Sequence, residues 1–350
     1  MRKIILLFLI LILGAGLIAC AGEEPPREEL TEPTFEITTT PTPTPTTTIK
    51  TEPTETEPPP IETELMFPGR YPVAFMINNT AEARPQSGLD KAKLIYQMMT
   101  EGRTTRLLLL TDAEEGVIGP VRSARPAYLD LVAQHQAFYC YAGNYAVVKA
   151  SPVVNQIRIL DALKGHYGIF YRSGHRVAPH NLYTTLERVY TAAEKDRPPL
   201  MPKEPVKGLS NYSDFVLPDG GEPALELHYR FSGLLEMFRY DSSVNAYFKY
   251  NNDQLLVDEQ SKQPLEVPNI IVLYRPHSFM PNGVHNKINW IDEGEATYLT
   301  GGRKYDITWK KTSHTDPIVY RLEGEELILN PGLTWIIVVD GQALKTVEYK

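Results

Sequence analysis

The feature that most constrains the fold of this chain is the stretch from residue 21 to residue 65, which has few apolar side chains. It holds eleven glutamates against only Arg27 and Lys50, and threonine alternates with proline through much of its length. Such a segment cannot bury enough apolar surface to offset the entropy lost on ordering its backbone. We therefore expect residues 21–65 to be a disordered tether, so that a globular fold must be built from residues 66–350.

The first 20 residues form a different kind of segment. A basic start, Arg2 and Lys3, precedes an apolar run from Ile4 to Ile18. The run ends in Leu-Ile-Ala-Cys, which resembles the bacterial lipobox and predicts a signal peptide over residues 1–20 with lipid on the Cys20 thiol. The alternative is a transmembrane anchor, but about 15 apolar residues fall short of the roughly 20 that span a bilayer. We expect a protein lipid-anchored to the cell membrane through Cys20, on its extracytoplasmic face.

The charge is concentrated at the N-terminal end of the chain. The formal net charge is −8, of which residues 21–65 contribute −9 and the first 20 residues +2. Residues 66–350 are therefore close to neutral, at −1. Binding to nucleic acid needs a broad basic surface, so we expect no nucleic-acid partner.

Residues 66–196 predict an N-terminal domain of α/β type. Apolar runs of strand type alternate with segments of helical spacing, and Thr184–Glu187 has the pattern of a helix-capping box. Residues 92–99 fit either a helix or a strand. This alternation is typical of α/β units. The strand-type runs are residues 71–77, 106–111 and 137–142.

The pattern changes after a connector at residues 197–223, which is rich in proline and glycine. From residue 224 to residue 350, short strand-type segments are separated by turns such as Asn251–Asp253. That pattern predicts a mostly antiparallel, β-rich C-terminal domain. The fold class expected for the whole body is α+β.

Arginines recur in polar, turn-rich loops of the N-terminal domain. Gly119–Pro126 places Arg122 and Arg125 just before a predicted helix, whose N-terminus also favours anions. A guanidinium stays protonated, and its planar fork suits a carboxylate or a phosphate. We predict that these loops converge on one cleft that binds an anionic envelope component. The residues expected to bind the ligand are Arg84, Gln86, Ser87, Arg106, Arg122, Ser123, Arg125, Arg172 and Asn181.

A structural role for the arginines is the alternative. Arg122 or Arg125 would then pair with a nearby acidic residue and tie the loops to the helix. The candidate acidic partners are Glu101, Glu82 and Asp130. A third possibility, a protein that acts only as a spacer or scaffold, requires all of these arginines to be in salt bridges.

The alternative function is a hydrolase or transferase that acts on an anionic envelope substrate. His180 titrates near neutral pH and fits a general acid or base, with Glu101 as its carboxylate partner. The structural alternative for His180 is a hydrogen bond to a backbone carbonyl. His175 and His180 have no acidic or cysteine companions in register, and there is no phosphate-cradling loop, so we expect no metal and no cofactor.

Two other features are compatible with a buried core. Cys140 lies in an apolar aromatic run, which predicts an inert thiol. The tryptophans of the C-terminal domain fit either the core or a sugar-binding face. They are Trp290, Trp309 and Trp335, with Tyr298 and Tyr305 beside them in the sequence pattern.

Taken together, these motifs resemble those of the YerB-like family of bacterial lipoproteins. The resemblance covers most of residues 67–350 and implies an N-terminal and a C-terminal domain behind a lipoprotein signal, without an established activity. The expected partners are the membrane and a cell-wall polymer or envelope protein. The stretches that carry the resemblance are residues 83–89, 101–102, 105–106, 119–125, 178–183, 309–311 and 329–335.

Overall fold

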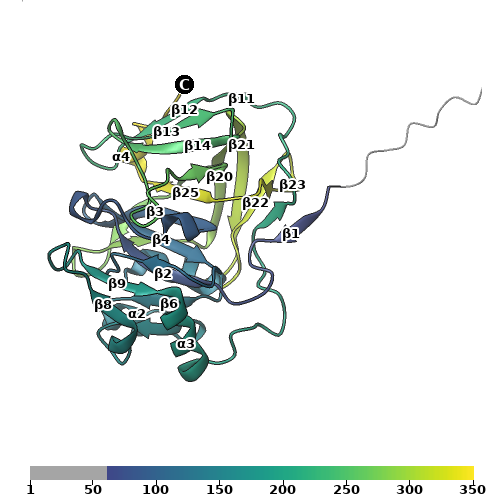
Figure 1. Ribbon diagram of the computed structural model, residues 1–350. Helices are drawn as coiled ribbons and strands as arrows, with labels where there is room; N and C mark the ends of the chain where they lie inside the picture. The colour runs from purple at the N-terminus through teal and green to yellow at the C-terminus, as the bar shows by residue number, and fades with distance from the viewer. Residues whose placement is uncertain (1–60) are drawn as a thin grey trace, which may run out of the picture. The chain divides into compact units, whose positions relative to one another are not determined.

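The computed structural model describes residues 61–350, so the predicted signal peptide, Cys20 and nearly all of the tether lie outside the described residues. Residues 61–350 belong to one compact unit built around a twelve-stranded sheet (Figure 1). In the part of the chain that is described, no helix is long and apolar enough to cross a membrane. In spatial order the strands of the sheet are β23 (Glu325–Glu326), β22 (Val319–Leu322), β21 (Arg303–Lys311), β20 (Asp292–Thr300), β17 (Asn269–Tyr274), β25 (Thr334–Val339), β3 (Leu94–Glu101), β4 (Thr104–Thr111), β2 (Val73–Asn78), β6 (Phe138–Tyr141) and β7 (Arg158–Asp161), with β11 (Glu222–Pro223) beside β21.

The large sheet joins the two predicted domains. β25 pairs in parallel with β17 on one side and with β3 on the other. All six residues of β25 are buried, as expected for a central strand that is covered on both faces. Residues 66–196 and 224–350 therefore share one hydrogen-bonded sheet.

A hydrophobic core lies on each face of this sheet, and each core draws on both halves of the chain. Successive residues of a strand point to opposite faces. In β25, Trp335 and Ile337 pack in one core, while Ile336 and Val338 pack in the other. The two cores are therefore separated by the large sheet and not by the connector at residues 197–223.

A second, six-stranded sheet covers one face of the large sheet. The aromatic ring of Phe238 from this sheet meets the ring of Trp335 edge to face, with centroids 5.8 Å apart. Its strands are β15 (Gln254–Leu255), β14 (Ala246–Asn251), β13 (Glu236–Asp241), β12 (Glu226–Tyr229) and β26 (Glu348–Tyr349), with β16 (Glu266–Val267) beside β14.

The remaining elements are short. The small sheets are β1 (Thr63–Leu65) with β10 (Ser210–Tyr212) and β24 (Ile328–Leu329), β18 (His277–Phe279) with β19 (Asn286–Ile288), and β5 (Val117–Ile118) with β9 (Leu182–Thr185) and β8 (Phe170–Arg172). The α-helices are α1 (Leu129–Gln134), α2 (Tyr145–Lys149), α3 (Leu186–Asp196) and α4 (Gly341–Leu344). The 3-10 helices are Ala81–Ala83, Leu89–Lys91, Pro126–Tyr128, Val154–Gln156 and Tyr167–Ile169.

The structure is mostly β, so the expected α/β character of residues 66–196 is present only in part. β2, β6 and β7 are parallel and have α1 and α2 in their connections. β3 and β4 form an antiparallel hairpin beside them, however, because the ambiguous residues 92–99 enter a strand that is buried on both faces. The mostly antiparallel reading of residues 224–350 agrees with the strand pairings inside that region, apart from the parallel pair β17 and β25.

The predicted boundaries of the tether and the connector need adjustment. Residues 63–65 were assigned to the tether, yet they form β1 and pair with β10 of the connector. β10 also pairs with β24. The buried side chain of Met66 and its backbone hydrogen bond to Leu209 hold this end of the body in place.

Helix α3 agrees with its predicted apolar face and differs by one residue at its cap. Thr185, rather than Thr184, is the N-cap, and its side chain accepts a hydrogen bond from the Arg188 amide. The hydroxyl of Thr184 instead donates to the Ile169 carbonyl at 2.6 Å. The buried face of the helix is the predicted one, with Leu186, Val189, Tyr190 and Ala193.

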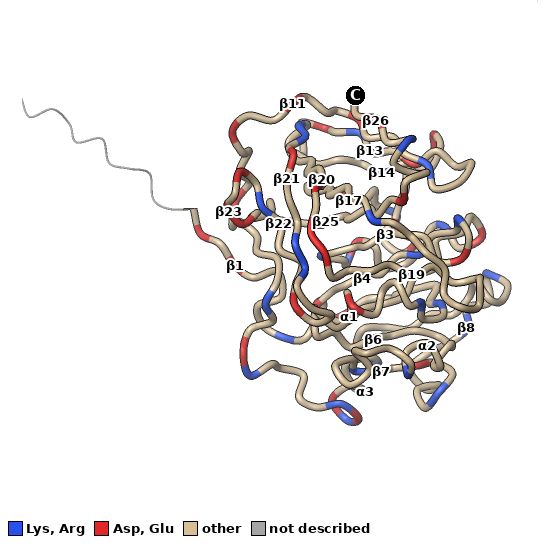
Figure 2. The backbone as a smooth tube through the Cα atoms, turned by 180° about the vertical axis from the view of Figure 1, so that it is seen from behind, with Lys and Arg blue, Asp and Glu red and all other residues tan. Residues whose placement is uncertain are grey.

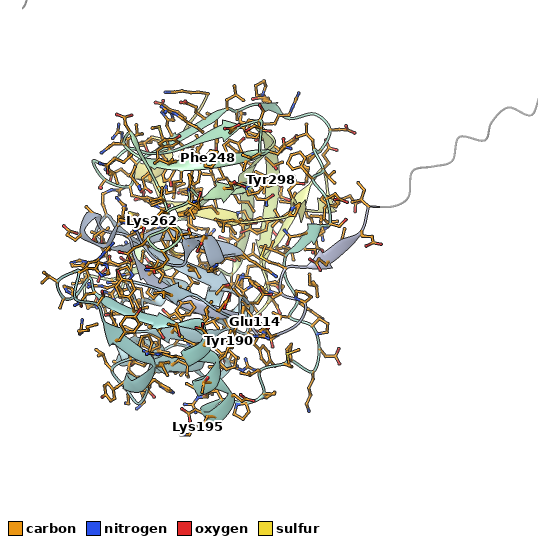
Figure 3. The ribbon with its side chains drawn as sticks, in the orientation of Figure 1. Glu114, Tyr190, Lys195, Phe248, Lys262 and Tyr298 are labelled. Carbon is orange, nitrogen blue, oxygen red and sulfur yellow. The ribbon has the colours of Figure 1, made fainter. Side chains whose placement is uncertain are left out.

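A cation–π contact fastens α3 to Arg70, which is itself held by an ion pair. Arg70 bonds Glu114 at 2.7 Å, and its guanidinium lies 4.8 Å from the centre of the Tyr190 ring. Glu114 and Tyr190 accordingly lie close together in Figure 3, while the exposed Lys195 marks the far end of the helix. The contact orients α3 against the first strands of the body.

The tryptophans and Cys140 belong to the core. Trp290, Trp309 and Trp335 are at most 2% exposed, so they do not form a sugar-binding face. Cys140 is fully buried, and burial raises the pKa of its thiol well above the usual value. A thiol in that environment is poorly nucleophilic.

Candidate functional site

The candidate site lies where parallel strands end. β2, β6 and β7 run parallel, so their carboxyl ends, at Asn78, Tyr141 and Asp161, share one edge of the sheet. Ligands of open parallel sheets bind at that edge. The backbone of Arg122 crosses it, with its amide bonded to the Met76 carbonyl at 2.8 Å and its carbonyl to the Ala142 amide at 2.9 Å.

Two arginines pair with one carboxylate here and a third lies nearby, and we call Glu101, Arg106, Arg122 and Arg125 the arginine cluster. Nη2 of Arg106 lies 3.3 Å from Oε1 of Glu101, and Arg125 forms an ion pair with the same oxygen. Both guanidinium groups also donate to the Ser123 carbonyl. Of the predicted ligand-binding arginines, Arg122 and Arg125 of a single loop thus lie near Arg106, which is on β4.

The arginines keep Glu101 ionised. Burial acts to raise its pKa, but the hydrogen bond from Arg125 and the charges of Arg106 and Arg125 outweigh burial and lower the pKa to about 2. Glu101 therefore cannot accept a proton near neutral pH. Arg106 and Arg125 therefore prevent Glu101 from acting as a general base.

The cluster carries an excess of positive charge. Arg106 and Arg125 are only 5% and 6% exposed. Burial, followed by the charge of Arg125, lowers the pKa of Arg106 to about 10. The same two causes lower the pKa of Arg122. The cluster thus holds three guanidinium groups and one carboxylate, which pairs with two of them.

Of the three arginines, Arg122 has the positive charge that is least compensated by other groups of the protein. Its Nη1 donates to the Pro179 carbonyl at 3.2 Å, and no acidic residue within 61–350 forms an ion pair with it. The Nε atoms of Arg122 and Arg125 are buried and have no hydrogen-bond partner in this part of the chain. A buried donor without an acceptor costs about 1–3 kcal/mol, which an anionic ligand would remove.

His180 lies beside this cluster but is not paired with Glu101. Its Nδ1 accepts a hydrogen bond from Asn78 Nδ2 at 2.7 Å, with the Thr80 hydroxyl at 3.5 Å. Among residues 61–350 no hydrogen bond or ion pair joins His180 to Glu101. The predicted acid–base pair is therefore not assembled, because the arginines hold Glu101 elsewhere.

Arg84 and Gln86 support the turn that follows β2. Arg84 Nη2 donates to the Asn79 carbonyl at 2.7 Å, and Gln86 Nε2 donates to the Asn78 carbonyl at 3.0 Å. Burial lowers the pKa of Arg84, although the charge of Glu236 opposes this effect. These two residues brace Asn78 and Asn79 at the edge of the candidate site.

Ser87 belongs to a separate group, which we call the Glu259 cluster. Glu259 accepts hydrogen bonds from the Ser87 hydroxyl at 2.6 Å and the Tyr183 hydroxyl at 3.0 Å. His175 Nε2 and Arg176 Nη2 each lie 2.8 Å from its Oε1. Despite burial, these partners lower the pKa of Glu259. This cluster ties the loop after β8 to the C-terminal half, so Ser87 is engaged internally.

Arg172 and Asn181 form a local pair. Nη1 of the exposed Arg172 donates to Asn181 Oδ1 at 2.8 Å, and Asn181 Nδ2 donates to the Ser173 carbonyl at 3.1 Å. They close the loop that carries Arg176 and His180. Basic segments gather near β8 and β19 in Figure 2, in the region of these loops.

Several residues of this region were not anticipated. Asn78 and Asn79 follow an apolar run directly, and a polar pair at the end of a buried strand is a usable signal. Asp161 carries no such local signal. Neither does Glu259, which lies 172 residues from Ser87 in the chain. Asp161 and Glu259 can be identified only from the tertiary structure.

Within 61–350, no group of three His, Cys, Asp or Glu side chains is placed to hold a metal ion. Cavities of about 600 and 980 Å³ are present, but other residues line them. The arginine cluster is therefore not in either of those cavities.

Comparison with known proteins gives a consistent match. The model of the DUF3048 N-terminal domain, described as a protein of unknown function, matches residues 59–199, and the DUF3048 C-terminal domain model matches residues 226–336. "Putative lipoprotein YerB" of Bacillus subtilis (strain 168) is 25% identical over 282 residues, which cover 80% of this chain and 84% of the relative. The crystal structure of YerB from Bacillus subtilis has a TM-score of 0.71 at 24% identity and covers 83% of this chain and 97% of that chain. The two share a fold.

Proposed function

The chain belongs to the DUF3048 family of proteins of unknown function, and on that premise we propose that it is a lipid-anchored envelope protein that binds an anionic partner through its arginine cluster. The lipobox-like residues ending at Cys20 and a relative named as a lipoprotein support the anchor. The anchor would hold the body at the extracytoplasmic face of the membrane. The partner would be a cell-wall polymer or an envelope protein that presents a carboxylate or phosphate.

The observation that carries this proposal is the charge imbalance of the cluster. The cluster holds three guanidinium groups and one carboxylate, which pairs with only two of them, and buried Nε atoms of Arg122 and Arg125 lack acceptors in the described chain. A hydrogen bond to a charged group contributes roughly 1.5–3 kcal/mol. Three such bonds approach the about 8 kcal/mol that corresponds to micromolar affinity. The cluster is thus chemically sufficient for binding an anion.

We do not propose an enzymatic function for this site. The proposed catalytic pair required His180 and Glu101 to interact, and Glu101 is held ionised by Arg106 and Arg125. His180 instead forms a hydrogen bond with Asn78. In that position its imidazole would be a polar group beside the bound anion. Ser123 contributes its carbonyl to the cluster, which fixes the arginines.

The test is titration of the body, residues 58–350, with inorganic phosphate and with acetate by calorimetry at low ionic strength. We expect Arg122→Gln to weaken binding at least tenfold, because Arg122 has no carboxylate of its own. Arg321→Gln is the matched control, since Arg321 is an exposed arginine that bonds only the Gly324 carbonyl. Equal affinities of the Arg122→Gln and Arg321→Gln variants would refute the proposal.

A further inference from the structure

A groove of about 510 Å³ lies on the part of the large sheet that the second sheet leaves open. Val272, Thr297 and Asp306 are register partners across β17, β20 and β21. Side chains of register partners point to the same face of a sheet. These three residues therefore form part of the groove floor, and α4 and β26 supply a wall through Leu344 and Tyr349.

The floor of the groove carries two carboxylates without internal partners. Glu295 and Asp306 are exposed, and neither forms a hydrogen bond or ion pair with any residue in 61–350. The neighbouring lysines are engaged elsewhere. Lys304 lies 2.5 Å from Glu222, and Lys310 lies 2.7 Å from Glu293. The groove thus presents two negative charges that the fold does not neutralise.

Aromatic and aliphatic side chains form the walls. Tyr274 is 41% exposed at the end of β17, and Leu344 is similarly exposed on α4. Tyr349 lies on β26, and the Nζ atom of Lys304 is 5.6 Å from the centre of the Tyr349 ring. That contact shows a cation against one wall of the groove. Aromatic faces attract cations, and organic ammonium groups are bound by such faces together with carboxylates.

We propose that this groove binds an organic cation, an ammonium group carried on an apolar chain. Its volume is in the range of small-molecule sites, and its apolar walls with a few polar groups match their composition. The two carboxylates exclude an anionic ligand by charge. A bare divalent ion prefers six or more oxygen ligands, which the walls formed by Val272, Leu344 and Tyr274 do not provide. The site is separate from the arginine cluster and does not depend on its function.

The experiment uses choline as the probe and its neutral isostere 3,3-dimethylbutan-1-ol as the matched ligand. Both are titrated into the purified full-length chain at constant ionic strength, with binding followed by calorimetry. We expect choline to bind at least tenfold more tightly than the neutral isostere, because the two differ only in charge.

Variants locate the interaction. Glu295→Gln combined with Asp306→Asn should weaken choline binding at least tenfold, and Tyr274→Ala should weaken it several-fold. Glu293→Gln is the control, because Glu293 is an exposed glutamate of the same strand that pairs with Lys310. The substituted side chains are exposed, so the thermal unfolding of the variants should match that of the parent.

Any one of the following results would overturn the proposal. The first is the absence of choline binding up to about 10 mM, which corresponds to less than roughly 3 kcal/mol of affinity. The second is equal binding of choline and its neutral isostere. The third is unchanged affinity in the Glu295→Gln, Asp306→Asn double variant, or equal displacement of choline by potassium, which would leave only a diffuse counter-ion effect.

Discussion

His135 shows how a buried side chain contributes to the response of this protein to acid. Its ring is 2% exposed, and Nε2 accepts hydrogen bonds from the Tyr96 hydroxyl at 2.9 Å and from Gln134 Nε2 at 3.2 Å. Burial, aided by the charge of Lys311, lowers the pKa of His135 from 6.5 to about 3. The folded protein therefore holds this imidazole neutral.

The sign of the pH dependence follows from that shift. Below pH 6.5 the unfolded chain binds a proton at His135 that the folded chain does not, so stability falls as the pH falls from 6.5 toward 3. The loss is about 1.4 kcal/mol per pH unit in that window. Glu101 acts at lower pH, since its folded pKa is about 2 and its stabilising contribution is lost between 4.5 and 2.

We predict that His135→Gln makes stability clearly less dependent on pH in the upper part of this window. Glutamine can accept the same hydrogen bonds but does not titrate. Urea unfolding of the parent should lose about 2.5 kcal/mol between pH 6.5 and about pH 4.5, and the variant should lose much less. An unchanged difference between the two pH values in the variant would show that other groups are responsible.

The residue types of the candidate site were predictable, but their partners were predictable only in part. Arg122, Ser123 and Arg125 belong to one loop, which reaches Arg106 on β4. Glu101 was a candidate both for assisting a histidine and for pairing with Arg122 or Arg125, and it pairs with Arg106 and Arg125. A carboxylate and a guanidinium attract each other strongly when both are partly desolvated, and this attraction decides the pairing.

At the scale of elements, a buried ion pair joins the second sheet to the large one. Lys249 on β14 lies 2.8 Å from Glu236 on β13, and Glu236 accepts a hydrogen bond from Gln97 on β3 at 2.7 Å. Lys249 Nζ also lies 5.2 Å from the Trp335 ring centre on β25. Burial alone would raise the pKa of Glu236, but Lys249 and Gln97 lower it. The pair fixes how the two sheets stack.

We predict that Lys249→Ala destabilises the protein by about 3–5 kcal/mol, because it leaves Glu236 charged and unpaired in the core. The double substitution Lys249→Met with Glu236→Gln should be much milder, since no uncompensated charge remains. Chemical denaturation of both variants measures the difference. If the single and double variants were equally unstable, packing rather than charge compensation would explain the effect.

Periodicity alone did not decide the type of every element. Strand-type runs such as residues 71–77 entered strands as predicted, because β2 is apolar from Val73 to Ile77. Residues 92–99 were ambiguous, since a strand buried on both faces loses the alternation that identifies it. Their assignment to β3 depends on β25 and β4 lying on either side.

At the scale of the whole molecule, the two matched family regions cannot be separated without cutting the central sheet. β25 of the C-terminal region lies between β17 and β3, so the sheet continues through both regions. The Glu259 cluster adds a second link, because Ser87, His175 and Arg176 converge on a residue of the C-terminal half. The arginine cluster is therefore held by a body that unites both halves.

Lipid attachment at Cys20 is a prediction that concerns the whole chain. We predict that Cys20→Ala releases the protein from the membrane to the soluble fraction, because the thiol would be the site of lipid attachment. Fractionation of cells that express the parent or the variant, followed by immunodetection, measures this release. Ala19→Gly is the matched control, since it keeps a small residue before Cys20. Continued membrane association of the Cys20→Ala variant would contradict lipid attachment as the main anchor.

The sequence by itself determined properties that depend on local composition and spacing. It predicted the tether, the lipobox-like segment, the strand-rich C-terminal half, the buried face of α3 and the arginine-bearing loops, since entropy, apolar periodicity and guanidinium chemistry act within a few residues of chain. Only the tertiary structure decided that one sheet spans both halves and that Glu101 meets Arg125. It also decided that Glu259 receives Ser87 from 172 residues away and that Glu295 and Asp306 share an open groove. These contacts arise from strand pairing between distant segments, which local patterns do not encode.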